Sequence, residues 1–523
     1  MGGKKQAQKK KQGQCKSKPG KCEGMCLLCR SLVISIIWGT AALIDPFGLK
    51  TAADLQSEAI FMRMIGGPWY ESSAQDQITV VLIDDQYLEK TGEFWPMSYL
   101  QQDLLLNDIL ALKPRAVFID LLYRHRHGEK EDVKQLAETI DIYQAADKPG
   151  QRNAIPIYVP WLIKDMDGTA TCVDATYTQA ASDPADLVLD NSVINEVAAS
   201  QAGRAFIGWT GCGSRYPNFV GGNPNLKTPA FAMYDLYCQS ETPRSPDCQA
   251  VVDKDYSGFS NPMVLRWGTG VSKLHYATLS KASVYCEQLS GSKRLGYMTA
   301  QFWSALGQSF SSSRERGKAE RCTYTDTLHA TWFLGASDEL RQFQKDMIED
   351  RYVFIGAQVD GVNDYMENPV NGKVPGVFLF SMALDNLMTL GSGYYKEMGG
   401  LFEGFVEIFT LFTITFAIGL FWLEYVKTCK PGKGKKRSLG SRYLETVVSI
   451  SVFKLVLPIS ISLLIAWLMW SMGYAPMDWI GVSLLAFIAN PVKFRDCSER
   501  LGIQGVCEKF FTIPGSNKKG RGA

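Results

Sequence analysis

The chain has 523 residues, a formal net charge of +2, 46% hydrophobic residues and 13 cysteines. The near-neutral charge gives no reason to expect nucleic-acid binding, which needs a basic surface. The sequence has no Walker phosphate loop, protein-kinase signature, HExxH zinc motif or recognisable cyclase block, so we expect no enzyme activity and no cofactor.

Long apolar segments lie near both ends of the chain, and the stretch between them is mostly polar. Since about 20 apolar residues in a helix cross a bilayer, we predict transmembrane helices at residues 26–45, 401–426, 445–471 and 477–494. A signal peptide is the competing interpretation of the first segment, because basic residues precede it, but the small-residue cleavage pattern is missing. In the second segment, Glu403 and Glu407 lie one helical turn apart near its outer end.

Lysine and arginine are concentrated in residues 1–25, in the 427–444 loop and in the 495–523 tail. By the positive-inside rule these three segments are cytoplasmic. The sequence therefore predicts a multi-pass protein of a bacterial inner membrane, in contact with membrane lipid, whose domain at 46–400 faces the periplasm. The tail is shorter than an independent domain of ~50 residues, so we expect the output to come from a separate protein.

The cysteines of the outer domain indicate an oxidising compartment, where disulfides form. Six residues are candidates for pairing, namely Cys172, Cys212, Cys238, Cys248, Cys286 and Cys322. Cys238 and Cys248 enclose the shortest loop and are the first expected pair, while the remaining pairings are not readable from sequence. Cys26 and Cys29 have the spacing of zinc ligands, but palmitoylation or apolar burial explains them as well, and we predict no metal site.

The outer domain begins with strand and helix signals in alternation. Ile78–Asp84 is a β-branched run, Pro96–Leu112 has apolar residues at helical spacing, and Ala116–Leu121 is a second apolar run. Together they predict a βαβ unit with parallel strands. Further strands are expected at 154–160, 204–209, 263–267 and 352–356 and a helix at 376–390, whereas 210–262 and 285–330 are predicted to be rich in loops. The predicted fold class is α/β, with a mainly parallel sheet and long insertions.

Short motifs at both ends of this domain resemble the CHASE2 family of extracellular sensory domains. In chain order they are Val81 to Asp85, Trp95-Pro96, Lys113 to Asp120, Phe354 to Gly356 with Asp360, Gly361 and Asp364, and Val374 to Val377. The resemblance extends over residues 40–425 and implies one span before the domain and a group of spans after it. Relatives usually continue into a cyclase, a histidine kinase or a serine/threonine kinase, whereas this sequence stops soon after its last apolar run.

Acidic residues follow two of the predicted strands. Because ligands of open α/β sheets bind beyond the carboxyl ends of the strands, Asp84, Asp85 and Asp120 are candidate ligand-binding residues, and the resemblance adds Asp364. Such carboxylates suit a cation or a polar ligand. The same residues are also typical caps of helices and loops, so the sequence leaves both interpretations open.

Basic residues follow Asp120 directly. Arg124, His125 and His127 are candidates for binding an anion or for sensing pH, since imidazole titrates near 6.5. A solvated loop explains the same pattern.

Two functions fit these observations. In the first, the protein is a CHASE2-like sensory or ligand-binding protein that acts through an unidentified partner protein. In the second, it is a structural or docking subunit of an envelope-spanning assembly, such as a secretion, conjugation or appendage machine. The family resemblance favours sensing and the cysteine-rich insertions favour docking, and a homo-oligomer is compatible with both.

Overall fold

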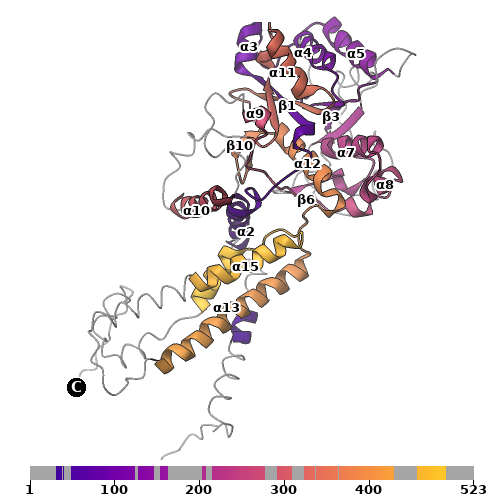
Figure 1. The fold of residues 1–523 in the computed structure, drawn as a ribbon. Helices are drawn as coiled ribbons and strands as arrows, with labels where there is room; N and C mark the ends of the chain where they lie inside the picture. The colour runs from indigo at the N-terminus through magenta and orange to yellow at the C-terminus, as the bar shows by residue number, and fades with distance from the viewer. Residues whose placement is uncertain are drawn as a thin grey trace, which may run out of the picture. The chain divides into compact units, whose positions relative to one another are not determined.

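The computed structural model describes residues 31–37, 39–40, 49–123, 128–145, 154–162, 203–207, 215–276, 291–308, 323–335, 337–362, 364–428 and 456–489 (Figure 1). The chain divides into two compact units. Unit 1 comprises Met1–Ser57, Met398–Ser471 and Pro476–Ala523, and unit 2 comprises Glu58–Glu397 and Met472–Ala475.

Unit 2 is built on a parallel sheet. Its strands, in the described part of the chain, are β1 (Ile78–Asp84), β2 (Ala116–Ile119), β3 (Ile157–Leu162), β4 (Gly203–Ile207), β7 (Asp326–His329) and β8 (Tyr352–Gln358). Their order is β4-β3-β2-β8-β1-β7, and every pairing is parallel. The mainly parallel α/β fold predicted from the sequence is therefore confirmed. The predicted βαβ unit differs in one respect, because β8 lies between β1 and β2.

Helices cover both faces of this sheet (Figure 1). One face packs against α3 (Asp85–Thr91), α4 (Tyr99–Ala111), α5 (Lys130–Gln144) and α11 (Asp338–Ile348). The other packs against α7 (Pro229–Ser240) and α12 (Val377–Leu390). Side chains alternate along a strand, so β1 sends Val81 and Ile83 to the first face and Val80 and Leu82 to the second. We call these the α4 face and the α12 face.

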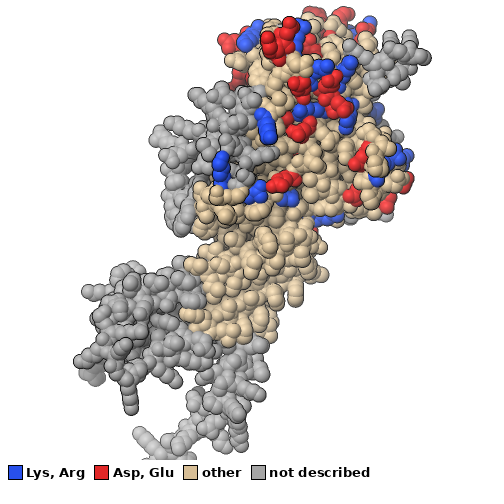
Figure 2. All heavy atoms as spheres, viewed as in Figure 1, with Lys and Arg blue, Asp and Glu red and all other residues tan. Residues whose placement is uncertain are grey.

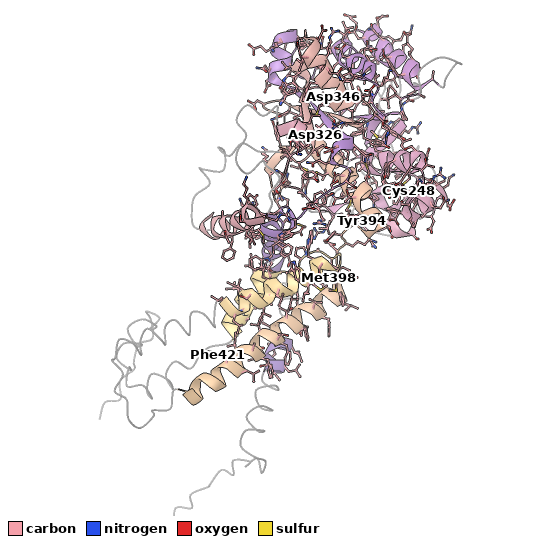
Figure 3. The ribbon with its side chains drawn as sticks, viewed as in Figure 1. Cys248, Asp326, Asp346, Tyr394, Met398 and Phe421 are labelled. Atoms are coloured by element: carbon pink, nitrogen blue, oxygen red, sulfur yellow. A yellow bond between two sulfur atoms is a disulfide. The ribbon has the colours of Figure 1, made fainter. Side chains whose placement is uncertain are left out.

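The α12 face has an aromatic core. The ring centroid of Phe231 lies 4.5 Å from that of Phe219 and 5.3 Å from that of Phe259, both at the tilted or edge-on angles that aromatic pairs prefer. A disulfide between Cys238 and Cys248 joins α7 to α8 (Pro246–Val252), as predicted, and Figure 3 labels Cys248. Four other cysteines that were expected to pair lie outside the described residues, namely Cys172, Cys212, Cys286 and Cys322.

The two stretches predicted to be loop-rich contain more regular structure than was predicted, and 210–214, 285–290 and 309–322 lie outside the described residues. Residues 210–262 include α7 and α8, and residues 285–330 include α10 (Gly291–Gln308) and β7. In α7, every residue from Pro229 to Tyr234 is buried. This first half of α7 is buried on all sides and has no polar face, so the apolar periodicity that reveals a surface helix is absent there. The described residues also form two short antiparallel pairs. One joins β5 (Arg215–Tyr216) to β6 (Met263–Val264), and the other joins β9 (Tyr365–Asn368) to β10 (Gly372–Pro375).

Unit 1 is helical. It contains the first part of α2 (Leu49–Phe61), then α13 (Gly400–Thr428), α15 (Leu457–Ser471) and α16 (Trp479–Ala489), and the last three pack against one another. Within the described residues, one helix is long and apolar enough to cross a membrane, at Leu401–Phe421. Four spans are therefore not confirmed: α15 and α16 are apolar but shorter, and much of 26–45 and 445–456 is not described. In Figure 2, α13 and α15 present an uncharged surface, whereas unit 2 carries charges of both signs.

The connection between α15 and α16 belongs to unit 2 rather than to unit 1. The backbone N–H of Lys396 donates to the carbonyl of Gly473 at 3.0 Å, and the N–H of Ala475 donates to the carbonyl of Lys396 at 2.9 Å. Lys396 also forms a β-bridge with Met263 of β6. Residues 472–475 are thus hydrogen-bonded to Lys396, close to the end of the long 58–397 segment of unit 2.

Candidate functional site

The carboxyl ends of the central strands carry the acidic residues singled out in the sequence. Asp84, the last residue of β1, caps α3: one carboxylate oxygen accepts from the Tyr87 N–H at 2.9 Å. His329 Nδ1 lies 2.7 Å from the other oxygen, and the Thr331 hydroxyl donates at 3.0 Å. Burial alone would raise the pKa of Asp84, but these hydrogen bonds outweigh it and lower that pKa. Asp84 therefore has the structural role of a cap, one of the two interpretations left open by the sequence.

Asp85 also holds the structure together at this edge. Its carboxylate accepts from the backbone N–H of Asp360 at 3.1 Å, which links the start of α3 to the loop after β8. Tyr365 lies close to the same acids: burial first, and then the negative charges of Asp360, Asp85 and Asp364, raise the pKa of its phenol. The residues after β1 and after β8 thus form one acidic rim.

Asp120 and Asp364 differ from Asp84 and Asp85. Asp120 follows β2, and its carboxylate makes no hydrogen bond to another described residue. Burial raises the pKa of Asp120 well above its usual range, and repulsion from Asp364 raises it further. Burial likewise raises the pKa of Asp364. The charged forms of these two nearby acids are therefore both disfavoured, and the pair holds a proton readily. Such a pair favours a ligand that brings a hydrogen-bond donor or a positive charge.

The start of α12 is fitted closely around Asp364. A Cβ built on Gly376 would lie 2.6 Å from the Asp364 carboxylate, so no larger residue fits at this position without a shift. The N–H of Gly376 also donates to the backbone carbonyl of Asp364 at 2.9 Å. The close approach places the Asp364 carboxylate at the N-terminal end of a 14-residue helix, whose dipole opposes but does not cancel the rise in the Asp364 pKa that burial causes.

The strand-end acids are not brought together as a metal site. Among the described residues, the acidic side chains close enough to share an ion are Asp54, Glu403 and Glu407 of unit 1, whose oxygens lie within 4.8 Å of one another. The sequence placed Glu403 and Glu407 one turn apart but gave no signal for Asp54. A cluster of carboxylates is common without a bound ion, and we assign no function to this one.

The remaining candidates fall into two groups. Arg124, His125 and His127 lie outside the described residues. His329 and Thr331 were missed, and Asp360 was named only as a motif residue, although all three contact the strand-end acids. His329 ends β7, a four-residue strand inside the stretch read as loop, so its position beside Asp84 depends on the parallel pairing of β7 with β1.

Comparison with known proteins adds one finding. The sequence profile of the CHASE2 domain family matches residues 32–421, which is well over half of the chain. No curated protein and no solved structure matches the sequence of this chain.

Proposed function

Because this chain belongs to the CHASE2 family of extracellular or periplasmic sensory domains, we propose that it is a membrane-bound sensor and not an enzyme. Unit 2 receives a ligand or an envelope condition outside the cytoplasm. The helices of unit 1 pass the change across the membrane, in several spans, to a separate cytoplasmic protein.

The observation that carries this proposal is the pairing of Lys396 with residues 472–475. Lys396 lies just before the chain enters unit 1 and α13, and residues 472–475 connect α15 to α16. Three helices of unit 1 are therefore continuous with one hydrogen-bonded junction inside the sensory domain. A shift at this junction reaches α13, α15 and α16 together.

The same pairing supports the predicted topology. Residues 472–475 are part of unit 2, so they lie on the side of the membrane where that unit lies. This agrees with an arrangement in which α15 runs outward, α16 runs inward, and the basic 427–444 segment is cytoplasmic.

The proposed sensing residues are Asp120 and Asp364. Asp84 and Asp85 already bond to the protein, whereas the Asp120 carboxylate makes no hydrogen bond to another described residue. A ligand that donates a hydrogen bond or carries a positive charge relieves the repulsion between Asp120 and Asp364, and it binds at the sheet edge where ligands of open α/β sheets bind.

Topology is tested with reporter enzymes that are active only outside the cytoplasm. We expect fusions after Leu390 and after Ala475 to be active and a fusion after Arg442 to be inactive. Activity only after Arg442 would overturn the proposed arrangement.

The sensing role is tested by photo-crosslinking in native membranes. A photoreactive amino acid placed in the 427–444 loop captures cytoplasmic neighbours, and the yield is compared between the wild-type protein, Asp120→Asn and Asp346→Asn. Asp346 is an exposed acid on α11 that serves as the matched control, and Figure 3 labels it. A sensor predicts that Asp120→Asn alone changes the crosslinking yield at equal protein level. A docking subunit of an envelope assembly predicts the same yield in all three proteins.

A further inference from the structure

We infer that the α4 face holds a binding pocket for a small neutral molecule that carries a hydroxyl group on an apolar body. The inference goes beyond the proposed sensing site, because the pocket involves neither Asp120 nor Asp364 and does not depend on the membrane topology.

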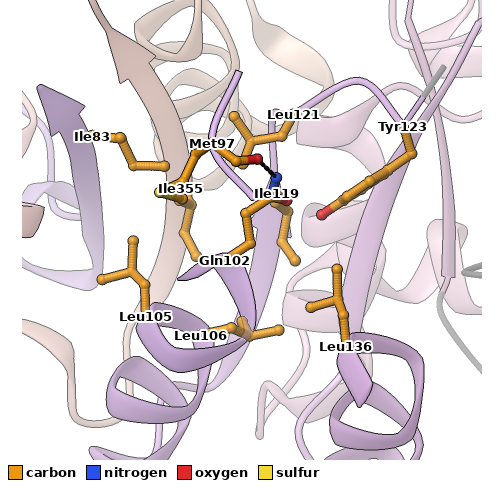
Figure 4. A pocket seen from close by; sticks show the side chains of 10 residues that line it. All are labelled: Ile83, Met97, Gln102, Leu105, Leu106, Ile119, Leu121, Tyr123, Leu136 and Ile355. Carbon is orange, nitrogen blue, oxygen red and sulfur yellow. Dashed lines mark hydrogen bonds between the residues drawn. The ribbon is translucent and has the colours of Figure 1, made fainter. Parts of the chain in front are cut away.

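The pocket lies beneath the carboxyl ends of the central strands (Figure 4). Ile83 of β1, Ile119 of β2 and Ile355 of β8 form its floor, and Leu105 and Leu106 of α4 and Leu136 of α5 form its walls. The hollow is partly open to solvent, and its enclosed part has room for about one water-sized group. A ligand therefore places one small group inside and the rest of its body toward the opening.

Two polar atoms line this apolar hollow without a hydrogen-bond partner among the described residues. They are the hydroxyl of Tyr123, a residue that is only 1% exposed, and Oε1 of Gln102. Figure 4 shows the Tyr123 hydroxyl pointing toward the Gln102 side chain. Gln102 Nε2 donates to the Met97 carbonyl at 2.9 Å, which fixes the amide orientation and leaves Oε1 as the unsatisfied atom. A buried polar atom without a hydrogen-bond partner lowers the stability of the folded state. Because these two atoms line the same hollow, one ligand group can reach both.

The chemistry of the two atoms selects the ligand. An amide oxygen only accepts a hydrogen bond, whereas a phenol hydroxyl donates or accepts. One ligand hydroxyl can donate to Gln102 Oε1 and accept from Tyr123, which satisfies both atoms at once. An ether or a ketone would leave Oε1 unsatisfied, because it has no proton to donate.

The lining excludes charged ligands. Ile83, Ile119 and Ile355 offer no counter-charge, and an ion moved from water into such surroundings is strongly disfavoured. Burial also raises the pKa of the Tyr123 phenol, so its hydroxyl stays neutral and remains a donor near pH 7.

The test uses two probes that differ only in the hydroxyl group, 4-fluorophenol and fluorobenzene. Their binding to the full chain in lipid nanodiscs is measured by fluorine NMR, and subtraction of protein-free nanodiscs removes lipid partitioning. We expect saturable binding of 4-fluorophenol and about 25-fold weaker binding of fluorobenzene, since fluorobenzene lacks two hydrogen bonds that each contribute about fivefold to affinity.

Substitution locates the site. Tyr123→Phe should weaken 4-fluorophenol about fivefold, the value of one ordinary hydrogen bond, and leave fluorobenzene unchanged. Tyr99→Phe is the matched control, because the Tyr99 ring stacks on that of Tyr123 at 5.9 Å but does not line the hollow. This control should bind both probes as the wild type does.

Three results would overturn the inference: no saturable binding of 4-fluorophenol, equal affinity for the two probes, or 4-fluorophenol binding that Tyr123→Phe does not change. The first would mean that a water molecule alone satisfies Tyr123 and Gln102. None of these results bears on the reporter fusions or on the crosslinking yields, so the inference and the proposed function fail separately.

Discussion

The two faces of the sheet in unit 2 are buried to a similar degree but packed differently. On the α12 face, aromatic rings interlock and a disulfide ties α7 to α8. A buried acid on this face, Asp385 of α12, accepts hydrogen bonds from the hydroxyls of Tyr70 and Ser72. The α4 face has a comparable apolar core but leaves a hollow, with the Tyr123 hydroxyl and Gln102 Oε1 unsatisfied.

This difference in packing indicates that the two faces have different roles. A close-packed face with its buried acid satisfied stabilises one conformation. A face with a hollow that is lined by unsatisfied polar atoms gains free energy when a suitable molecule enters. We therefore assign stability to the α12 face and small-molecule recognition to the α4 face.

The largest expected effect is a difference between two identical substitutions. Leu384 on α12 and Leu106 on α4 are both at most 2% exposed. Leu384→Ala should lower the free energy of unfolding by about 4–5 kcal/mol and Leu106→Ala by about 2–3 kcal/mol, because Leu106 already borders empty space and loses fewer contacts. Unfolding in detergent followed by tryptophan fluorescence measures both. Equal losses would mean that the two faces are equally well packed.

The next effect concerns pH and the α12 face. Burial raises the pKa of Asp385 to about 6, although the hydrogen bonds from Tyr70 and Ser72 oppose the rise. The folded state then holds this proton more tightly than the unfolded state. The resulting stability is complete below the unfolded pKa near 4 and is lost as the pH rises through about 6, by about 3 kcal/mol in total.

Substitution isolates this contribution, because other buried acids titrate as well. The difference in unfolding free energy between pH 4 and pH 7 should shrink in Asp385→Asn, which cannot ionise. Asp346→Asn, at an exposed position, should keep the wild-type profile. An unchanged profile in Asp385→Asn would show that this carboxyl does not titrate between pH 4 and pH 7.

The smallest expected effect is the change in stability when a buried tyrosine on each face is replaced by phenylalanine. Tyr70→Phe removes a hydrogen bond from buried Asp385 and should cost about 2 kcal/mol. Tyr123→Phe removes a hydroxyl that has no hydrogen-bond partner among the described residues, and it should leave stability unchanged or raise it by about 1 kcal/mol. Thermal unfolding of both variants measures the signs. A clear loss of stability in Tyr123→Phe would show that its hydroxyl is satisfied in the folded protein.

Local patterns in the sequence predicted much of the fold. The β-branched runs at Ile78–Asp84 and Tyr352–Gly356 became β1 and β8, and the helical spacing in Pro96–Leu112 became α4. The shortest cysteine loop predicted the Cys238–Cys248 disulfide. These features depend on residues that are close in the chain, and the sequence displays such patterns directly.

Features that depend on distant residues were not predictable in the same way. The insertion of β8 between β1 and β2 joins strands from opposite ends of the domain. The role of Asp84 as a cap with His329 as its partner requires the pairing of β7 with β1. The hollow on the α4 face depends on how three strands and two helices fill the space between them, and no periodicity in the sequence records a gap in packing.

Hydrogen exchange of the full chain in nanodiscs, with and without 4-fluorophenol, tests the division between the two faces most directly. The probe should slow exchange of the backbone amides in α4 (Tyr99–Ala111), because a filled hollow stabilises the helix above it, and should leave α12 (Val377–Leu390) unchanged. Exchange that slows equally in both helices, or in neither, would contradict the assignment of recognition to the α4 face.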